Sequence, residues 1–214
     1  LEIQRKAGSR AAQISSYVGL GMIAYARQDL GGAIQTWQLG LAIAEEVGSK
    51  QRMGVLLNNI GELYLEQGDL ELADGVLNRA REIVLETGDK RTNAEICRNL
   101  ATLALESSQF DQANVFADEA VETCRLIRAR PALALALRTK AQLLSHQLYV
   151  DESGPSAATI EAGKCYDEAI RIFEEIGDRL ELARTLRSHA SHLEERGGEE
   201  RAEILRARAD KLEG

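Results

Sequence analysis

The sequence predicts an all-α fold made of stacked helical hairpins. The main observation is that small residues recur in two series, which we call the first-helix markers and the second-helix markers. The first-helix markers are Gly21, Gly61, Ala101, Ala141 and Ala190, and the second-helix markers are Ala33, Ala73, Ala113, Ala162 and Ala202. Successive markers lie 40 residues apart, except for one step of 49 in each series. Only two prolines occur in 214 residues, which agrees with a helical chain.

The stretch of residues 54–91 shows the pattern of one hairpin most clearly. Apolar residues lie three and four positions apart around the marker Gly61, as they do on one face of a helix, and the same spacing recurs around Ala73. A Gly68-Asp69 turn separates the two helices. Because both markers are small, we expect the helices to pack at close range. One hairpin cannot bury its apolar faces alone, so it needs neighbours of the same kind.

The markers divide the chain into five hairpins. We expect them at residues 11–48, 51–88, 92–129, 131–177 and 179–212. Their turns are expected at Asp29-Leu30-Gly31, Gly68-Asp69, Ser107-Ser108-Gln109 and, in the last hairpin, Gly197-Gly198. The nine extra residues fall in the fourth hairpin, where Gly154-Pro155 and small polar neighbours predict an inserted loop near residues 149–158. The last helix is charged all round except at Ala202, Leu205, Ala209 and Leu212, as expected at the end of an array.

The first residues are in register with the end of a second helix. Gly8 matches Gly48, Gly88 and Gly177, which are expected to end helices because glycine adopts positive φ without strain. We therefore predict a truncated helix before the first hairpin and interpret the chain as a fragment of a longer protein. Its first edge should expose apolar surface, through which copies of the chain could associate into a homo-oligomer.

The pattern resembles the tetratricopeptide repeat (TPR) family, in a form with repeats of about 40 residues rather than 34. The second hairpin carries the motif best, with Leu57, Ile60-Gly61, Tyr64, Gly68-Asp69, Ala73, Leu77 and Ala80. The resemblance implies one array over residues 1–214, coiled as a right-handed α-solenoid. It also implies a concave groove, lined by the first helices, that binds a protein or peptide.

Composition excludes several other functions. The formal net charge of −8 argues against general affinity for nucleic acid. No apolar run approaches the roughly 20 residues of a membrane span. Three cysteines lack metal-binding or redox spacing and are interpreted as buried thiols in a reducing compartment, so we expect a cytoplasmic protein.

No motif predicts an enzyme, a cofactor or a metal site. The chain has no phosphate-binding loop and no GxSxG or HExxH sequence. His189 and His192 are spaced as two metal ligands on one helix would be. His189, however, occupies the repeat position of Ile60 and Leu100, which is a packing position, so we interpret both histidines as structural.

The candidate binding residues lie on what we call the first-helix face. It comprises two positions in each repeat, three residues before and one residue after the first-helix marker, together with their near neighbours. The two positions point away from the core face. The predicted site residues are Asn58, Asn59, Glu62, Arg98, Asn99, Thr102, Arg138, Gln142, Arg184 and Arg187.

Three of these residues, Arg98, Arg138 and Arg187, share one repeat position. Guanidinium groups bind carboxylates in bidentate fashion, and asparagine amides can hold an extended backbone, so we expect an acidic or extended peptide ligand. The alternative is that these arginines are solvated or pair with Glu62 and Glu95 across neighbouring helices, worth about 0–1 kcal/mol each.

We therefore predict a non-catalytic scaffold that binds a protein or peptide in its groove. A second hypothesis is a sensor or autoinhibitory segment of a larger signalling protein, such as a bacterial kinase or a signal-transducing ATPase, whose C-terminal parts such arrays resemble. A third is a self-association module.

Overall fold

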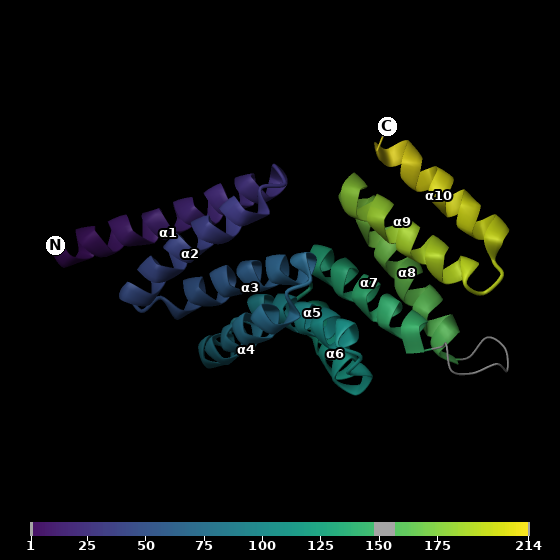
Figure 1. Ribbon diagram of the computed structural model, residues 1–214, viewed down its shortest axis with the longest axis horizontal. Helices are drawn as coiled ribbons and strands as arrows, with labels where there is room; N and C mark the ends of the chain where they lie inside the picture. Colours follow the sequence, from purple (N-terminus) through teal and green to yellow (C-terminus); the bar gives the residue numbers. More distant parts are fainter. Residues whose placement is uncertain (1, 148–156, 214) are drawn as a thin grey trace. The chain divides into compact units, whose positions relative to one another are not determined.

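The fold is known from a computed structural model, which describes residues 2–147 and 157–213. Helices α1 to α10 follow one another, and no strand occurs within these ranges (Figure 1). Their bounds are α1 Glu2–Ala26, α2 Leu30–Glu46, α3 Lys50–Gln67, α4 Leu70–Thr87, α5 Lys90–Glu106, α6 Phe110–Leu126, α7 Arg130–Gln147, α8 Ala157–Ile176, α9 Arg179–Glu194 and α10 Glu199–Glu213. The predicted all-α class is confirmed.

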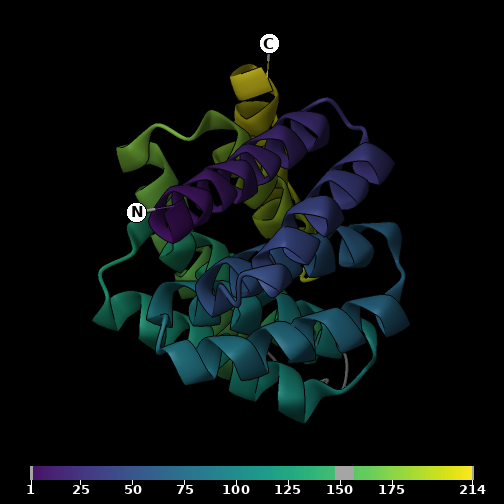
Figure 2. The same ribbon diagram turned by 90° about the vertical axis from the view of Figure 1, so that its left-hand side faces the viewer.

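The chain divides into two compact units, residues 1–107 and 108–214. In the first unit, α1 with α2 and α3 with α4 form antiparallel hairpins, and α2 packs on α3, α4 on α5 and α3 on α5 (Figures 1 and 2). In the second unit, α7 with α8 and α9 with α10 form hairpins, and α7 also packs on α6 and α9 (Figure 1). That the ten helices belong to one array remains a prediction from the sequence.

The marker residues lie where the helices of a hairpin meet. All ten are buried. A Cβ atom on Gly21 would lie 2.1 Å from the Trp37 indole nitrogen, and one on Gly61 would lie 2.5 Å from Leu77 Cδ2. The predicted close packing of the two helices is therefore confirmed within these hairpins.

Glycines with positive φ end several helices, as predicted at Gly48, Gly88 and Gly177. At three other helix ends the same conformation is adopted by Gln28, Ser108 and Arg128, whose φ values are 63°, 59° and 56°. The first turn differs from the prediction, because α2 begins at Leu30 and includes Gly31. The turn therefore lies at residues 27–29, where the Asp29 side chain caps α2 by accepting from the Gly32 amide at 2.9 Å.

The expected separate helix at the start of the chain is not found. Helix α1 runs without a break from Glu2 to Ala26, so Gly8 lies inside it. A glycine inside a helix costs only about 0.5–1 kcal/mol relative to alanine, and the alanines and arginine around Gly8 favour helix. The match of Gly8 to later helix ends was therefore misleading.

The first edge of the first unit exposes apolar side chains, as predicted. Leu20 is 54% exposed, whereas its repeat equivalents Ile60 and Leu100 are each 2% exposed. Ile23, next to it in the helical pattern, is 51% exposed. The difference arises because α2 packs on α3 and α4 on α5, while no helix of the first unit's described residues occupies the corresponding place on α1.

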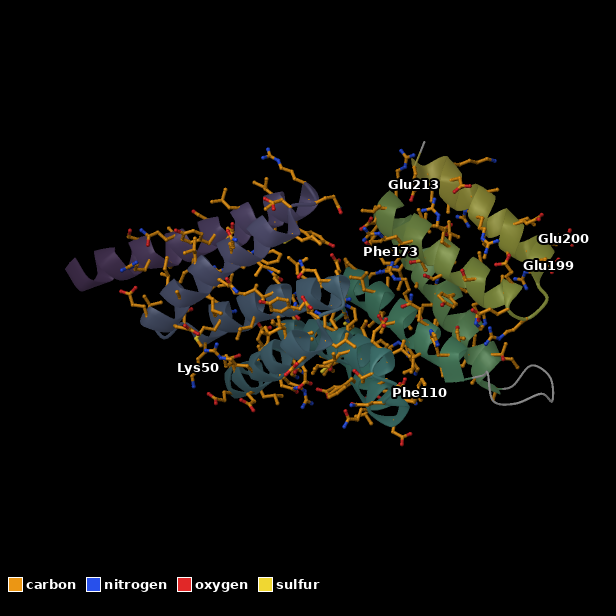
Figure 3. All side chains as sticks on the ribbon, in the orientation of Figure 1. Lys50, Phe110, Phe173, Glu199, Glu200 and Glu213 are labelled. Carbon is orange, nitrogen blue, oxygen red and sulfur yellow. The ribbon has the colours of Figure 1, made fainter. Side chains whose placement is uncertain are left out.

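Ion pairs connect the start of a hairpin to its end. Arg10 contacts Glu46 at 2.9 Å, and Lys50, at the start of α3, pairs with Glu86 near the end of α4 (Figure 3). These side chains are largely exposed, so each pair contributes about 0–1 kcal/mol to stability. They fix the ends of the hairpins less than the buried markers do.

The last helix has the predicted polar character. Glu199 and Glu200 stand at the start of α10 and Glu213 near its end (Figure 3). Its buried residues are Ala202 and Ala209. The loop predicted near residues 149–158 lies almost wholly outside the described residues. None of the described helices combines the length and the apolar character that crossing a bilayer requires.

Candidate binding surface

Two of the predicted site residues are buried rather than exposed. Asn58 on α3 is 3% exposed and Asn99 on α5 is 1% exposed. The Asn99 side-chain amide donates to the Asn58 side-chain oxygen at 3.0 Å. The expected exposure is therefore wrong for Asn58, because α5 packs directly against α3 and covers a position that the helical pattern placed opposite the core.

Arg98 contacts two of the other predicted residues of the first unit, Glu62 and Thr102. Its guanidinium contacts Glu62 at 2.7 Å, and the two side chains are 16% and 39% exposed. Thr102 donates its hydroxyl proton to the Arg98 carbonyl oxygen at 3.2 Å. Burial raises the pKa of nearby Glu95, although Arg98 opposes this effect. Asn59 is half-buried.

Arg138 on α7 pairs with Glu181 on α9. Their atoms Nη1 and Oε2 lie 2.6 Å apart, and the side chains are 16% and 17% exposed. Arg138 also donates to the Thr185 hydroxyl at 3.3 Å, and Arg184 reaches Glu181 at 2.7 Å. Burial opposes ionisation of Glu181, but Arg138 and Arg184 outweigh it and hold its pKa below the usual value.

Arg187 on α9 is more exposed and is held by the end of α10. It contacts Asp210 at 3.0 Å and also pairs with Glu213. Hydrogen bonds to these two carboxylates raise its pKa. Each of the three arginines at the shared repeat position thus has a carboxylate partner on another helix. This geometry favours the paired alternative over three free guanidinium groups.

The second unit contains a pocket of about 240 Å³ between α7 and α9. It is lined by Gln142, Ser145 and His146 from α7, Tyr166 from α8, Ser188 and Ser191 from α9, and Glu195, which directly follows α9. We call it the α7/α9 pocket. Gln142 alone was among the predicted site residues. Apart from Tyr166, the others follow if the stripe through Gln142 and Ser188 is continued by one or two helical turns, to the C-terminal end of α7 and just past that of α9.

An aromatic and imidazole cluster adjoins the pocket. The Tyr166 ring stacks on His189 with ring centroids 4.8 Å apart, and its centroid lies 5.6 Å from that of His192. Ser145 Oγ lies 2.7 Å from His192 Nδ1. Burial raises the pKa of Tyr166 to about 12, despite a hydrogen bond with Ser145 that lowers it. Both histidines are buried, in agreement with their predicted packing role.

The two buried histidines, His189 and His192, both have lowered pKa values. Burial, with the nearby charges of Arg196 and His189, lowers the pKa of His192 to about 4, and burial also lowers that of His189. Within residues 2–147 and 157–213, no three His, Cys, Asp or Glu side chains are placed to hold a metal ion. The described arrangement is one of hydrogen bonding and packing.

Comparison with protein families identifies the chain. The sequence model of the tetratricopeptide repeat family matches residues 11–86 and 52–126, which together cover more than half of the chain. The chain therefore belongs to the tetratricopeptide repeat family, as its sequence pattern predicted. Members of this family generally serve as protein-interaction modules. No curated protein sequence gives a significant match.

Solved structures share the fold at low sequence identity. The alignment with BtubC (BKLC) from P. vanneervenii covers 100% of this chain and 91% of BtubC, with a TM-score of 0.68 and 16% identity. A second structure is PH0952 from Pyrococcus horikoshii, a signal transduction ATPase with numerous domains (STAND) that has a tetratricopeptide repeat sensor. The alignment covers 98% of this chain and 31% of PH0952, with a TM-score of 0.64 and 19% identity. The alignment with the apo form of RapI covers 99% of this chain and 58% of RapI, with a TM-score of 0.62 and 15% identity. These likenesses support the repeat solenoid fold.

Proposed function

We propose that this chain is a non-catalytic module that binds a segment of a partner protein along its first-helix face. The observation that carries the proposal is the α7/α9 pocket, which opens between two successive first helices. Gln142, Ser188 and Ser191 at this pocket all lie on or beside the repeat positions expected to face a ligand. Their polar groups suit recognition of a peptide.

The ion pairs change the expectation about the charge of the ligand. An acidic peptide was expected from the arginines, but a carboxylate ligand would have to displace Glu62 from Arg98 and Glu181 from Arg138. Both of these arginines are only 16% exposed and already neutralised. The geometry therefore supports binding of a protein segment without supporting a preference for acidic segments.

Selection from a library of displayed random peptides tests this proposal. The full chain should enrich a consistent set of peptides. Replacing Ser191 with arginine fills the α7/α9 pocket and should weaken their binding by at least about tenfold, because a lost set of buried polar contacts is worth 1.4 kcal/mol or more. Isothermal titration calorimetry would measure the change.

The matched control is Ala207→Arg, which adds the same side chain at an exposed position of α10. It should leave peptide binding unchanged. Two outcomes would contradict the proposal: a library that yields no binding peptide, or selected peptides that bind the Ser191→Arg and wild-type chains equally well.

A regulatory segment of a larger signalling protein is a second candidate. The observation that favours it is the similarity to PH0952, which has a repeat sensor and of which this chain matches 31%. The complete reading frame decides the matter. A nucleotide-binding or kinase domain on the same polypeptide would support this candidate, and a reading frame containing repeats alone would oppose it.

Self-association is a third candidate, favoured by the exposed Leu20 and Ile23 on α1. Sedimentation velocity would reveal a dimer that dissociates when both are replaced by glutamate. The same replacement of the exposed Val115 and Leu126 on α6 serves as the control. A cytoplasmic location and a lack of affinity for nucleic acid stay predictions from the sequence.

A further inference from the structure

The two serines that α9 contributes to the α7/α9 pocket are hydrogen-bond acceptors for a ligand. The Ser188 hydroxyl donates to the Arg184 carbonyl oxygen at 3.1 Å, and the Ser191 hydroxyl donates to the Arg187 carbonyl oxygen at 3.2 Å. Each bond reaches back four residues along α9 and uses the only proton of that hydroxyl. The two serines therefore offer oxygen lone pairs to a ligand.

Ser145 on α7 behaves in the same way, and Gln142 does so in part. Ser145 Oγ lies 2.7 Å from both the Ala141 carbonyl oxygen and His192 Nδ1, so its proton has a partner inside the protein. The Gln142 amide nitrogen is directed at Ser188 Oγ, 3.4 Å away, which leaves the amide oxygen as the acceptor. The hydroxyl protons of the three serines are thus engaged within the protein, as is one of the two amide protons of Gln142.

The lining also carries a negative charge at Glu195. Glu195 pairs with Arg196, whose guanidinium donates to the carbonyl oxygens of His192 at 2.8 Å and Ser145 at 3.1 Å. Its contact with Glu195 is longer, at 3.4 Å. His192 adds no positive charge at neutral pH, since burial lowers its pKa to about 4. The surroundings of Glu195 therefore leave room for a second cation.

We propose that the α7/α9 pocket receives the side chain of a lysine or arginine from the partner segment. A cationic donor matches these acceptors and a carboxylate, whereas a carboxylate or phosphate ligand needs donors, and the serine protons are engaged within the protein. The volume of about 240 Å³ is below the roughly 300–1,000 Å³ of sites for drug-sized ligands, and so it suits one long side chain. This inference rests on the proposed protein-binding function and specifies the anchor residue of the partner.

Small probes test the pocket directly. The N-acetyl methylamides of lysine, arginine, norleucine and glutamic acid would each be titrated into the full chain and followed by the amide resonances of Gln142, Ser188 and Ser191. The lysine and arginine probes should shift these resonances in a saturable way. The norleucine probe, which keeps the apolar stem without the charge, and the glutamic acid probe should not.

Charge variants identify the recognised group. Glu195→Gln should weaken binding of the lysine probe by about tenfold, since it removes a charge-assisted hydrogen bond. Glu199→Gln makes the same change on α10 outside the pocket lining and should leave binding unchanged. Binding of the glutamic acid probe, no binding of the two cationic probes, or equal effects of the two variants would each overturn the inference.

Failure of this inference can be told apart from failure of the proposed function. Library peptides that depend on Ser191 but contain no lysine or arginine would overturn the cationic anchor and leave protein binding intact. A library that yields no peptides at all would overturn the function itself.

Discussion

The side-chain amide of Asn99 hydrogen-bonds to the side-chain oxygen of Asn58 at 3.0 Å, between two successive first helices. Both residues are almost fully buried, at 1% and 3% exposure. A buried amide that loses its partner costs about 1–3 kcal/mol, whereas replacing both partners with apolar groups of similar shape costs much less. The pair therefore fixes how α3 and α5 align more than it adds net stability.

A double-mutant cycle tests this account. Asn99→Leu and Asn58→Leu should each lower the free energy of unfolding by about 1–3 kcal/mol, and the double variant should lower it by less than their sum. Urea denaturation followed by circular dichroism would measure all three. Asn78→Leu, at an exposed position of α4, is the control and should change stability by less than about 0.5 kcal/mol. Strict additivity would show that the hydrogen bond does not couple the two residues.

The close approach of α3 and α4 predicts opposite effects of the same substitution at two glycines. A Cβ atom on Gly61 would lie 2.5 Å from Leu77 Cδ2, so Gly61→Ala should destabilise by about 1–3 kcal/mol through overpacking. A Cβ atom on Gly75 meets nothing within 4 Å, so Gly75→Ala should stabilise α4 by about 0.5–1 kcal/mol. Thermal unfolding would compare the two variants. A stabilising Gly61→Ala would mean that the helices can separate freely.

The left-handed residues at helix ends predict a stabilising substitution. Gln28 has φ 63° at the repeat position where Gly68 has φ 77°. Because this conformation strains a side chain with a Cβ atom, Gln28→Gly should stabilise by up to about 1 kcal/mol, and Gly68→Ala should destabilise by about 1 kcal/mol. Denaturation midpoints would measure both. A loss of stability in Gln28→Gly would show that flexibility of the unfolded chain outweighs the relieved strain.

The hairpins were predictable from the sequence because their constraint repeats. Two helices that pack at short range need small residues at the point of contact, and that point recurs every 40 residues wherever the turn keeps its length. Gly21 and Gly61 therefore marked the contacts with Trp37 and Leu77 without any knowledge of the structure. Gly8 shows the limit of this argument, since a glycine at a helix-end position can also lie within a helix.

The binding surface was less predictable because its contacts do not repeat. A helical pattern separates a core face from an outer face, but a first helix in this fold also contacts the neighbouring first helix, which buries Asn58 and Asn99. Arg98 pairs with the preceding first helix and Arg138 with the following one, at sequence separations of 36 and 43 residues. No fixed spacing therefore identifies the partner of an arginine.

The partly buried pair of Arg138 and Glu181 predicts a larger effect than the exposed pairs. Glu181→Gln would leave the guanidinium of Arg138, which is 16% exposed, without its charged partner, and should cost about 1–3 kcal/mol. Glu175→Gln breaks the pair with Arg130, where both side chains are about half exposed, and should cost less than about 1 kcal/mol. Urea denaturation of both variants at low and high salt would measure the two losses of stability. Equal losses of unfolding free energy in the two variants would show that burial does not strengthen the pair of Arg138 and Glu181.

The lowered pKa of His192 predicts that the second unit loses stability in mild acid. Its pKa is about 4 in the folded chain and 6.5 in an exposed histidine, because burial and the charges of Arg196 and His189 disfavour the imidazolium ion. Between pH 7 and pH 5 the unfolded chain takes up a proton at this residue while the folded chain does not. The free energy of unfolding should therefore fall by about 2 kcal/mol over this interval from His192 alone. Burial lowers the pKa of His189 as well, which acts in the same direction.

Comparing variants at the two pH values isolates this contribution from that of the carboxylates. His192→Gln should be less stable than the wild type at pH 7, because it loses the contacts with Tyr166 and Ser145, but its stability should change less between pH 7 and pH 5. Ala207→Gln, at an exposed position of α10, keeps His192 and should keep the full loss. Nuclear magnetic resonance titration of the imidazole protons would report the folded pKa directly. If His192 titrated near 6.5 in the folded chain, the unfolded and folded states would take up protons together, and the predicted loss of stability would vanish with the difference in pKa.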